Sequence, residues 1–123
     1  MSRSQADDDL ASRRRAGRVI RRCAPVPPQL VRTAALLERR WQISILYAAL
    51  SGAARFSEFA AAVEGISPRV LSARLRELER AGLLRRRVLP SSPPAVEYRL
   101  TEEGRRLASI IEALLEYSSG RSS

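Results

Sequence analysis

Histidine and lysine are both missing from this chain of 123 residues, and it contains a single cysteine, Cys23. The lack of histidine removes the commonest general base and the commonest metal ligand. One cysteine excludes an internal disulfide and a cysteine-clustered zinc site. No glycine-rich loop that could cradle a phosphate is present, and no carboxylates cluster outside the N-terminal arm. The sequence therefore predicts neither an enzyme nor a protein that holds a metal or a cofactor.

Long apolar runs are absent as well. None approaches the 18 or so residues of a membrane span. Asp7, Asp8 and Asp9 stand where the apolar stretch of a secretory signal would begin. We therefore expect a cytoplasmic protein without a membrane partner. Hydrophobic residues make up 45% of the chain, and its length is enough for one domain with a modest core.

Arginine is the residue that the sequence has in excess. All 22 basic residues are arginine, the chain has 13 acidic residues, and its net charge is +9. A surface this basic favours polyanions, with nucleic acid first and an anionic membrane second. Arginine also suits planar, bidentate contact with phosphate and with guanine edges. A GC-rich genome would account for the absence of lysine, but not for the clustering of the arginines.

Composition divides the chain into three parts. Residues 1–28 are expected to form a basic, flexible arm, because Ser, Asp and Arg dominate and Pro25, Pro27 and Pro28 interrupt regular structure. A short helix at 10–23 fits the pattern there, although Gly17 weakens it. Residues 29–118 are expected to form one folded domain, and residues 119–123 a disordered tail.

The sequence of the first half of the domain predicts three helices. Hydrophobic periodicity indicates a helix from Gln29 to Arg40 and a second, apolar nearly all round, from Trp41 to Leu50. Gly52 is expected to end the second helix in a left-handed conformation. Ser57 is expected to cap a short third helix, Glu58 to Val63.

A fourth helix is predicted to begin with Ser67 as its cap and Pro68 at its first position, and to end at Gly82. Two short helices joined by a glycine-containing turn are typical of a helix-turn-helix. Two strands, 84–89 and 96–100, then surround a Pro/Ser loop, and Thr101 is expected to cap a last helix. The fold class is therefore mainly α with a small antiparallel β-hairpin, a winged helix-turn-helix.

The fourth helix separates leucine from arginine. At 100° per residue, its leucines lie within about 60° of one another, and its arginines fall mostly on the opposite side. The leucine stripe consists of Leu71, Leu75 and Leu78, and the opposite side carries Arg69, Ala73, Arg76 and Arg80. The alternative is a solvated face on which Arg76 and Arg80 pair with Glu77, Glu79 or water.

The charge of the surrounding chain favours nucleic acid over that alternative. From Ile66 to Leu100 there are eight arginines and three glutamates. Arg85-Arg86-Arg87 lies at the base of the predicted hairpin, and Arg55 precedes the third helix. Helix-turn-helix, wing and local positive charge occur together in proteins that bind nucleic acid.

The order of these residues resembles the HxlR family of bacterial winged helix-turn-helix regulators over roughly 36–117. The resemblance rests on Trp41 with Ile45-Leu46, on "RFSEF" (55–59), on "GISPRVLSARLRELERAGLL" (65–84) and on "PPAVEYRLTEEGRRL" (93–107). It implies a homodimeric transcription factor that binds a pseudo-palindromic operator in double-stranded DNA, with the terminal helices forming the dimer interface. The alternative is a winged-helix protein-interaction module without operator binding.

The resemblance and the charge pattern together define candidate site residues. The DNA-facing set is Ser67, Arg69, Ser72, Ala73 and Arg76 by position, with Arg55, Arg86 and Arg87 added by charge. Arg69 is assigned to a base edge, because its end of the helix enters the major groove. Arg86 and Arg87 are assigned to phosphate, and strand parity does not say which of the two points at DNA. Two apolar stripes supply the dimerisation set: Leu30, Leu37, Leu107, Ile110, Ile111, Leu114 and Leu115.

Three departures from the family qualify these assignments. Many members carry Cys-Pro-Val about 13 residues before the Trp, and in some that cysteine senses oxidants. Here Pro28 holds the position, so the sensor role does not transfer and Cys23 is expected to be an ordinary exposed thiol. The alternative is a redox role, because the arginines of the arm favour the thiolate form. The run 38–41, Glu-Arg-Arg-Trp in place of the usual Gly-Gly-Lys-Trp, predicts a more continuous helix before Trp41. Ala73 replaces a longer polar residue and could contact only a thymine methyl group.

Two partners outside the recognition helix are expected. Arg13, Arg14 and Arg15 in the arm could lie along phosphates or enter a minor groove. A small-molecule effector could bind between the terminal helices and the core, where Trp41 and Tyr47 could line a pocket. For Trp41 a place in the core is the favoured alternative, given how often large aromatic side chains are buried.

Overall fold

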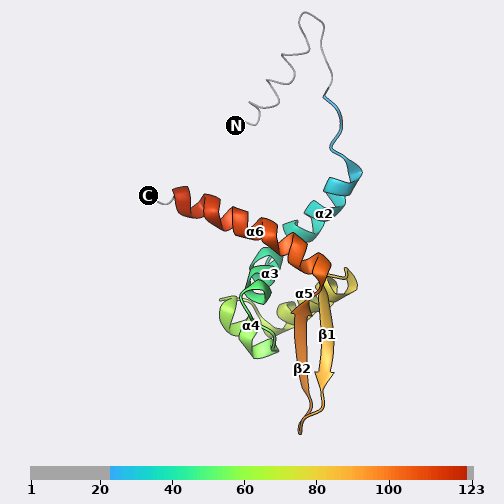
Figure 1. The fold of residues 1–123 in the computed structure, drawn as a ribbon, viewed down its shortest axis with the longest axis vertical. Coiled ribbons are helices and arrows are strands. Elements are labelled where there is room, and N and C mark those ends of the chain that lie inside the picture. The colour runs from blue at the N-terminus through green and yellow to red at the C-terminus, as the bar shows by residue number, and fades with distance from the viewer. Residues whose placement is uncertain (1–22, 122–123) are drawn as a thin grey trace, which may run out of the picture. The chain divides into compact units, whose positions relative to one another are not determined.

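The computed structural model describes residues 23–121, and the chain divides into one unit up to Ala34 and a second from Ala35 onward. The elements run α2 (Pro28–Glu38), α3 (Gln42–Leu50), α4 (Phe56–Ala62), α5 (Pro68–Arg80), β1 (Leu84–Leu89), β2 (Ala95–Leu100) and α6 (Glu102–Arg121) (Figure 1). The predicted class, mainly helical with one antiparallel hairpin, is confirmed. Residues 1–22 of the predicted arm, with Arg13, Arg14 and Arg15 and most of the 10–23 helix, lie outside the described residues.

Two predicted boundaries are corrected by the structure. α6 extends to Arg121, so Ser119 and Gly120 are helical and do not belong to a disordered tail. The chain is also not continuous helix before Trp41: α2 ends at Glu38, and Trp41 has a φ of 82° in the left-handed region. The backbone N–H of Gln42 donates to the Arg39 carbonyl at 3.1 Å, which closes a tight turn between α2 and α3.

The start of α4 differs from the prediction in its capping residue. Ser57 lies within the helix, and Arg55 is the N-cap. The carboxylate of Glu58 performs the capping instead, since its Oε1 accepts from the backbone N–H groups of Ala54 at 2.8 Å and Arg55 at 3.0 Å. A carboxylate at the start of a helix satisfies free N–H groups and complements the positive end of the helix dipole.

Other predicted ends are confirmed. The Ser67 Oγ accepts from the Val70 N–H at 3.1 Å, with Pro68 as the first residue of α5. Gly52 follows α3 with a φ of 115°, a conformation that residues with a Cβ rarely adopt. The Thr101 Oγ1 accepts from the Gly104 N–H at 3.0 Å and donates to the Gly82 carbonyl at 2.6 Å. Thr101 therefore caps α6 and ties it to the turn after α5.

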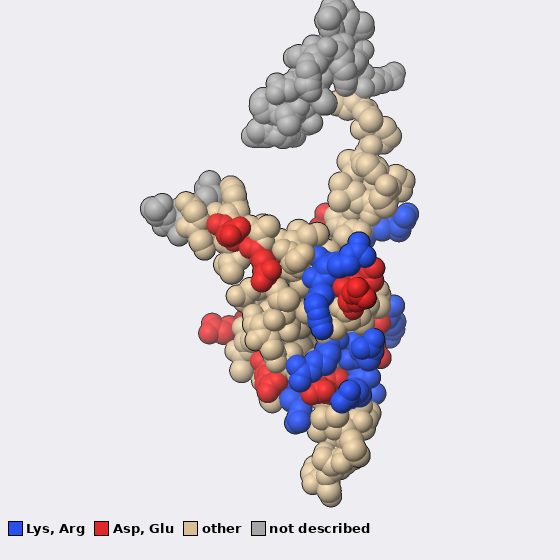
Figure 2. Space-filling model, in the orientation of Figure 1, with Lys and Arg blue, Asp and Glu red and all other residues tan. Residues whose placement is uncertain are grey.

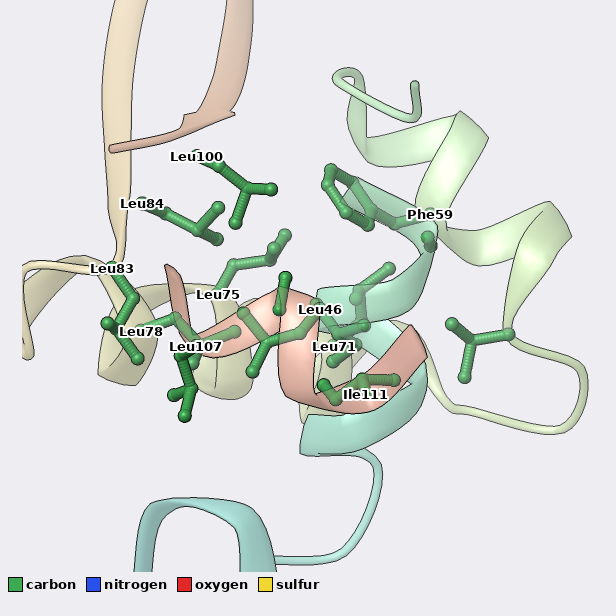
Figure 3. Packing of buried hydrophobic residues seen from close by; sticks show 14 residues of the cluster. Leu46, Phe59, Leu71, Leu75, Leu78, Leu83, Leu84, Leu100, Leu107 and Ile111 are labelled. Atoms are coloured by element: carbon green, nitrogen blue, oxygen red, sulfur yellow. The ribbon is translucent and has the colours of Figure 1, made fainter. Parts of the chain in front are cut away.

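One core joins all elements of the unit that begins at Ala35 (Figure 3). The leucine stripe of α5 is completely buried, with 0% exposure at each of Leu71, Leu75 and Leu78. It packs with Ile45 and Leu46 of α3 and with residues from α4, both strands and α6. A Cβ at Gly104 would collide with the Leu83 carbonyl oxygen, so only glycine permits this approach of α6 to the start of the hairpin.

Candidate nucleic-acid interface

The helix-turn-helix consists of α4, the turn 63–67 and α5. Hydrogen bonds from the backbone N–H groups of Arg55 and Ala54 hold the pKa of Glu58 below its ordinary value, and the guanidinium groups of Arg55 and Arg99 act in the same direction. Ionised Glu58 therefore fixes the start of α4 and, with it, the placement of Arg55. The Arg55 side chain is exposed at this point.

Glu58 is expected to make the stability of the domain depend on pH. A carboxylate whose folded-state pKa is depressed adds stability above its ordinary value of 4.5, and that stability is lost as the pH falls through the lower folded value. Thermal melts of the wild type and of Glu58→Gln between pH 7 and pH 3 should therefore differ most at pH 7 and converge in acid. A difference that stays constant over this range would contradict the role of the ionised carboxylate.

The outer face of α5 presents exposed arginines. Arg69, Arg76 and Arg80 are exposed, whereas Ser72 and Ala73 are half-buried beside them. Within residues 23–121, none of these three guanidinium groups forms an ion pair. Arg76 and Arg80 therefore do not pair with Glu77 or Glu79, and of the solvated-face alternative only contact with water is left. Ser67 lies at the same N-terminal end as Arg69, and its oxygen is engaged as the helix cap.

Glu77 instead ties the middle of α5 to the turn between α2 and α3. Its Oε2 accepts from the Arg39 Nη2 at 2.7 Å and from the Arg74 Nη1 at 3.3 Å. The Arg74 Nε also donates to the Arg40 carbonyl at 3.0 Å, and the Arg40 guanidinium lies 4.4 Å from the centre of the Trp41 ring. We call Arg39, Arg74 and Glu77 the α5 clamp. Sequence reasoning missed it, because Arg39 lies 38 residues before Glu77.

The α5 clamp is expected to contribute to sequence preference. Glu77→Gln removes the negative charge that pairs with two guanidinium groups, whereas Glu79→Gln removes the same charge from the same helix without touching the clamp. Both variants should bind random DNA somewhat more tightly. The ratio of operator to random affinity should fall a few-fold in Glu77→Gln alone, because exposed ion pairs are each worth about 0.2–1 kcal/mol. Equal ratios in fluorescence-anisotropy titrations of the two variants would count against the clamp.

The register of the hairpin separates the wing arginines onto two faces. Arg86 lies opposite Tyr98, and Leu84 lies opposite Leu100. Directly opposite residues share a face, and Tyr98 packs edge-on against Phe59 of α4 with ring centres 6.5 Å apart. Arg86 is therefore on the face that packs toward the domain, and Arg85, Arg87 and Arg99 share the outer face.

The outer face of the hairpin carries one carboxylate, Glu97. It lies opposite Arg87 but is engaged by Arg99, whose Nη2 is 3.0 Å from its Oε2. Figure 2 shows basic side chains gathered over the base of the hairpin, while the tip, residues 90–94, carries no charge. The geometry gives a surface of positive charge that runs along the hairpin base and is suited to a phosphate backbone.

The residues predicted to mediate dimerisation occupy different environments. Leu107 and Ile111 are 9% and 4% exposed and belong to the core, so they are not free surface. Ile110, Leu114 and Leu115 are 58%, 46% and 48% exposed on α6. Leu30 of α2 is exposed, and Leu37 is half-buried and packs against the core cluster. The exposed part of the predicted stripe on α6 is therefore Ile110, Leu114 and Leu115.

A cavity lies between α3 and α6, and it includes one of the two predicted pocket residues. Tyr47 lines it, whereas Trp41 does not and packs instead against the core cluster near Gly65.

Cys23, the first residue that the structure describes, is exposed. Among residues 23–121 there is no cluster of metal-ligating side chains and no helix that could span a membrane.

Comparison with known proteins places this geometry in a family. A family model described as HxlR-like helix-turn-helix matches residues 36–122. The HTH-type transcriptional regulator YvaP of Bacillus subtilis (strain 168) is 39% identical over 92 residues, which span 75% of this chain and 85% of that protein. YodB, an HTH-type transcriptional regulator of the same organism, is 34% identical over 87 residues, which span 71% of this chain and 78% of that protein.

Solved structures agree with the sequence comparisons. Reduced YodB from B. subtilis matches with a TM-score of 0.68 and 30% identity, over 80% of this chain and 97% of that one. The redox regulator HypR in its reduced form matches with a TM-score of 0.70 and 36% identity, over 76% of this chain and 94% of that one. The protein therefore belongs to the HxlR family of winged helix-turn-helix, DNA-binding transcriptional regulators.

Proposed function

We propose that this regulator acts in the cytoplasm as a homodimer that recognises a pseudo-palindromic operator in double-stranded DNA. The observation that carries the proposal is the outer face of α5, where Arg69, Arg76 and Arg80 are exposed and unpaired among the described residues. The buried leucines and the α5 clamp hold this face outward. The N-terminal end of such a helix enters the major groove in helix-turn-helix proteins.

The division of labour within the interface follows from chemistry. Arg69 is proposed to read a base edge, most often guanine, through a bidentate contact. Ser67, Ser72, Ala73 and Arg76 are proposed to line the same groove, with Ala73 limited to apolar contact. Arg55 and one of the wing arginines, Arg87 on the outer face or Arg86 on the opposite one, are proposed to contact phosphates, which fix position without reading sequence.

Homodimerisation is supported by the exposed aliphatic residues of α6. Ile110, Leu114 and Leu115 lie on the last helix of the domain, with Tyr117 exposed beyond them. A second protomer would cover these side chains and place a second α5 on the same face of the DNA. A two-fold arrangement of this kind requires half-sites about one helical turn, or a multiple of it, apart.

Selection from random DNA with the full chain tests the proposal. We expect an enriched inverted repeat that competes for binding at about physiological salt, where random DNA does not. Enrichment of a single unrepeated site would contradict the dimeric arrangement. Binding without any sequence preference would instead favour a protein-interaction module that has kept the winged fold.

A further inference from the structure

The cavity between α3 and α6 is large enough for a small molecule. Its volume is about 550 Å³, within the range of roughly 300–1,000 Å³ that is typical of ligand sites. α3 and the residues that follow it form one side, and Ile111, Leu114, Leu115 and Ser118 of α6 form the other. All of these residues belong to the unit that begins at Ala35.

The wall of this cavity is apolar with a few hydroxyl groups, and the described part of the chain contributes no charged side chain to it. Ser51 donates to the Tyr47 carbonyl at 2.9 Å and Ser118 to the Leu114 carbonyl at 3.0 Å, which leaves the lone pairs of both oxygens as acceptors. Ser44 and Tyr47 form no side-chain hydrogen bond with another residue in the described part of the chain. Their hydroxyl groups are therefore available both to donate and to accept.

An anion is a poor occupant of this wall. Burying a charge without a partner is costly, and no arginine among residues 23–121 lines the cavity. Ser51, which lines it, is also the C-cap of α3. The carboxyl end of a helix carries partial negative charge, so the local field disfavours an anion further.

We propose that this cavity binds a neutral, largely apolar small molecule that carries one or two hydroxyl groups, of the kind exemplified by a phenol. The ligand hydroxyl would exchange hydrogen bonds with Tyr47 and Ser44, and the ring would pack against Leu114 and Ile111. As an effector site, the cavity rests on the proposed regulatory function, whereas ligand binding itself does not.

A second copy of the chain is the competing occupant, because Leu114 and Leu115 belong both to the cavity wall and to the proposed dimerisation surface. The exposed stripe of α6 that would enter from a second copy is aliphatic at Ile110, Leu114 and Leu115, with the hydroxyl group of Tyr117 beyond them. Its aliphatic part would remove water from the exposed side chains of Ser44 and Tyr47 without replacing the hydrogen bonds. A small molecule with its own hydroxyl group replaces them, so we take a ligand as the occupant, with a second copy as an outcome of the test.

Isothermal titration of the full chain with two matched probes tests the charge argument. At pH 7, 2-naphthol is neutral and 2-naphthoate is an anion of similar size. We expect saturable binding of 2-naphthol, one per chain, and at least tenfold weaker binding of 2-naphthoate. Equal affinity for the two probes would overturn the proposal, as would the absence of saturable binding by both 2-naphthol and the smaller 4-ethylphenol.

Variants locate the bound probe. Ala62 lines the cavity and Ala61, its neighbour on α4, does not, and both are exposed. Ala62→Phe should therefore weaken 2-naphthol binding at least tenfold, with Ala61→Phe unchanged. Tyr47→Phe, which removes one hydrogen bond, should weaken it about fivefold. Binding that is indifferent to Ala62→Phe and Tyr47→Phe would place the probe elsewhere and overturn the assignment.

Two further measurements separate this inference from its alternatives. If 2-naphthol binding disappears as the protein is concentrated, and Ala62→Phe weakens self-association, the occupant is a second copy and the proposal fails. Operator binding, measured separately, reports on the proposed function. Intact operator binding without 2-naphthol binding would overturn only the ligand site, and the reverse result would overturn only operator recognition.

Discussion

Arg69→Ala is expected to weaken operator binding by about 1–3 kcal/mol and to relax sequence preference at one base pair in each half-site. Arg69 is exposed in the first turn of α5, at the end that enters the major groove, and no carboxylate in residues 23–121 neutralises it. Random DNA should lose much less affinity, because base-edge contacts do not form there. Titrations with the operator, with single-base variants of it and with random DNA measure all three effects.

Arg80→Ala is the matched control for this prediction. Arg80 is also exposed and also lacks an ion pair in the described part of the chain, but it lies in the last turn of α5. Its removal takes away the same charge at the opposite end of the helix. Loss of preference in Arg80→Ala to the same extent as in Arg69→Ala would contradict the docking direction.

The wing is expected to contact the DNA phosphates and not the base edges. Arg87→Ala is expected to weaken binding to the operator and to random DNA alike, and to lower the salt slope by about one unit for each phosphate that is no longer neutralised. Arg86→Ala removes the same charge from the opposite face of the hairpin. The variant with the larger salt effect therefore identifies the face that lies against the DNA. If Arg87→Ala changed sequence preference and Arg69→Ala weakened all DNA equally, helix and wing would have exchanged roles.

The parts of this interface that rest on local patterns were predictable from sequence. The 3.6-residue spacing of Leu71, Leu75 and Leu78 required one buried face, and this alone placed Arg69 and Arg76 outward. Ser67 followed by Pro68 marked the start of α5. Local hydrogen bonding and hydrophobic periodicity decide these features, so neighbouring residues contain the necessary information.

The α5 clamp and the break before Trp41 were not predictable in this way. Without glycine or proline, the run 38–41 gives no local signal of a turn. The turn exists because groups distant in sequence support it: Arg74 donates to the Arg40 carbonyl, and Glu77 accepts from Arg39. The need for glycine at position 104 is equally non-local, because a Cβ there would collide with the carbonyl oxygen of Leu83, 21 residues earlier in the chain. Interactions of this range depend on the assembled fold.

The dimerisation stripe shows the same limit in another form. Periodicity grouped Leu107 and Ile111 with Ile110, Leu114 and Leu115, because all five fall on one broad apolar side of α6. Periodicity alone could not say which residues on that side are buried in the core and which are exposed. The packing of α6 decides this: Ile111 is buried in the core with 4% of its surface exposed, whereas Ile110 next to it is 58% exposed.

That division defines the sharpest test of the dimer. Ile110→Glu combined with Leu114→Glu places two charges on the exposed stripe and should leave the fold intact, because both side chains are about half exposed in the single chain. We expect the variant to be a monomer by light scattering at micromolar concentration. Operator affinity should fall roughly a hundredfold or more, because two linked half-site contacts become independent. Ile110 does not line the α3–α6 cavity, so Ile110→Glu alone separates the interface from the ligand site.

Two controls make the dimer result interpretable. Ser109→Glu adds a charge on α6 about 100° from Ile110 and should leave the dimer intact. Ile111→Glu should unfold the domain, since burial of an unpaired charge in the core is costly, and circular dichroism would reveal that loss. A wild-type chain that is monomeric at micromolar concentration would contradict the homodimer. A double variant that stays dimeric with normal operator affinity would move the interface away from α6, leaving α2, with its exposed Leu30, as the remaining apolar surface of the predicted set.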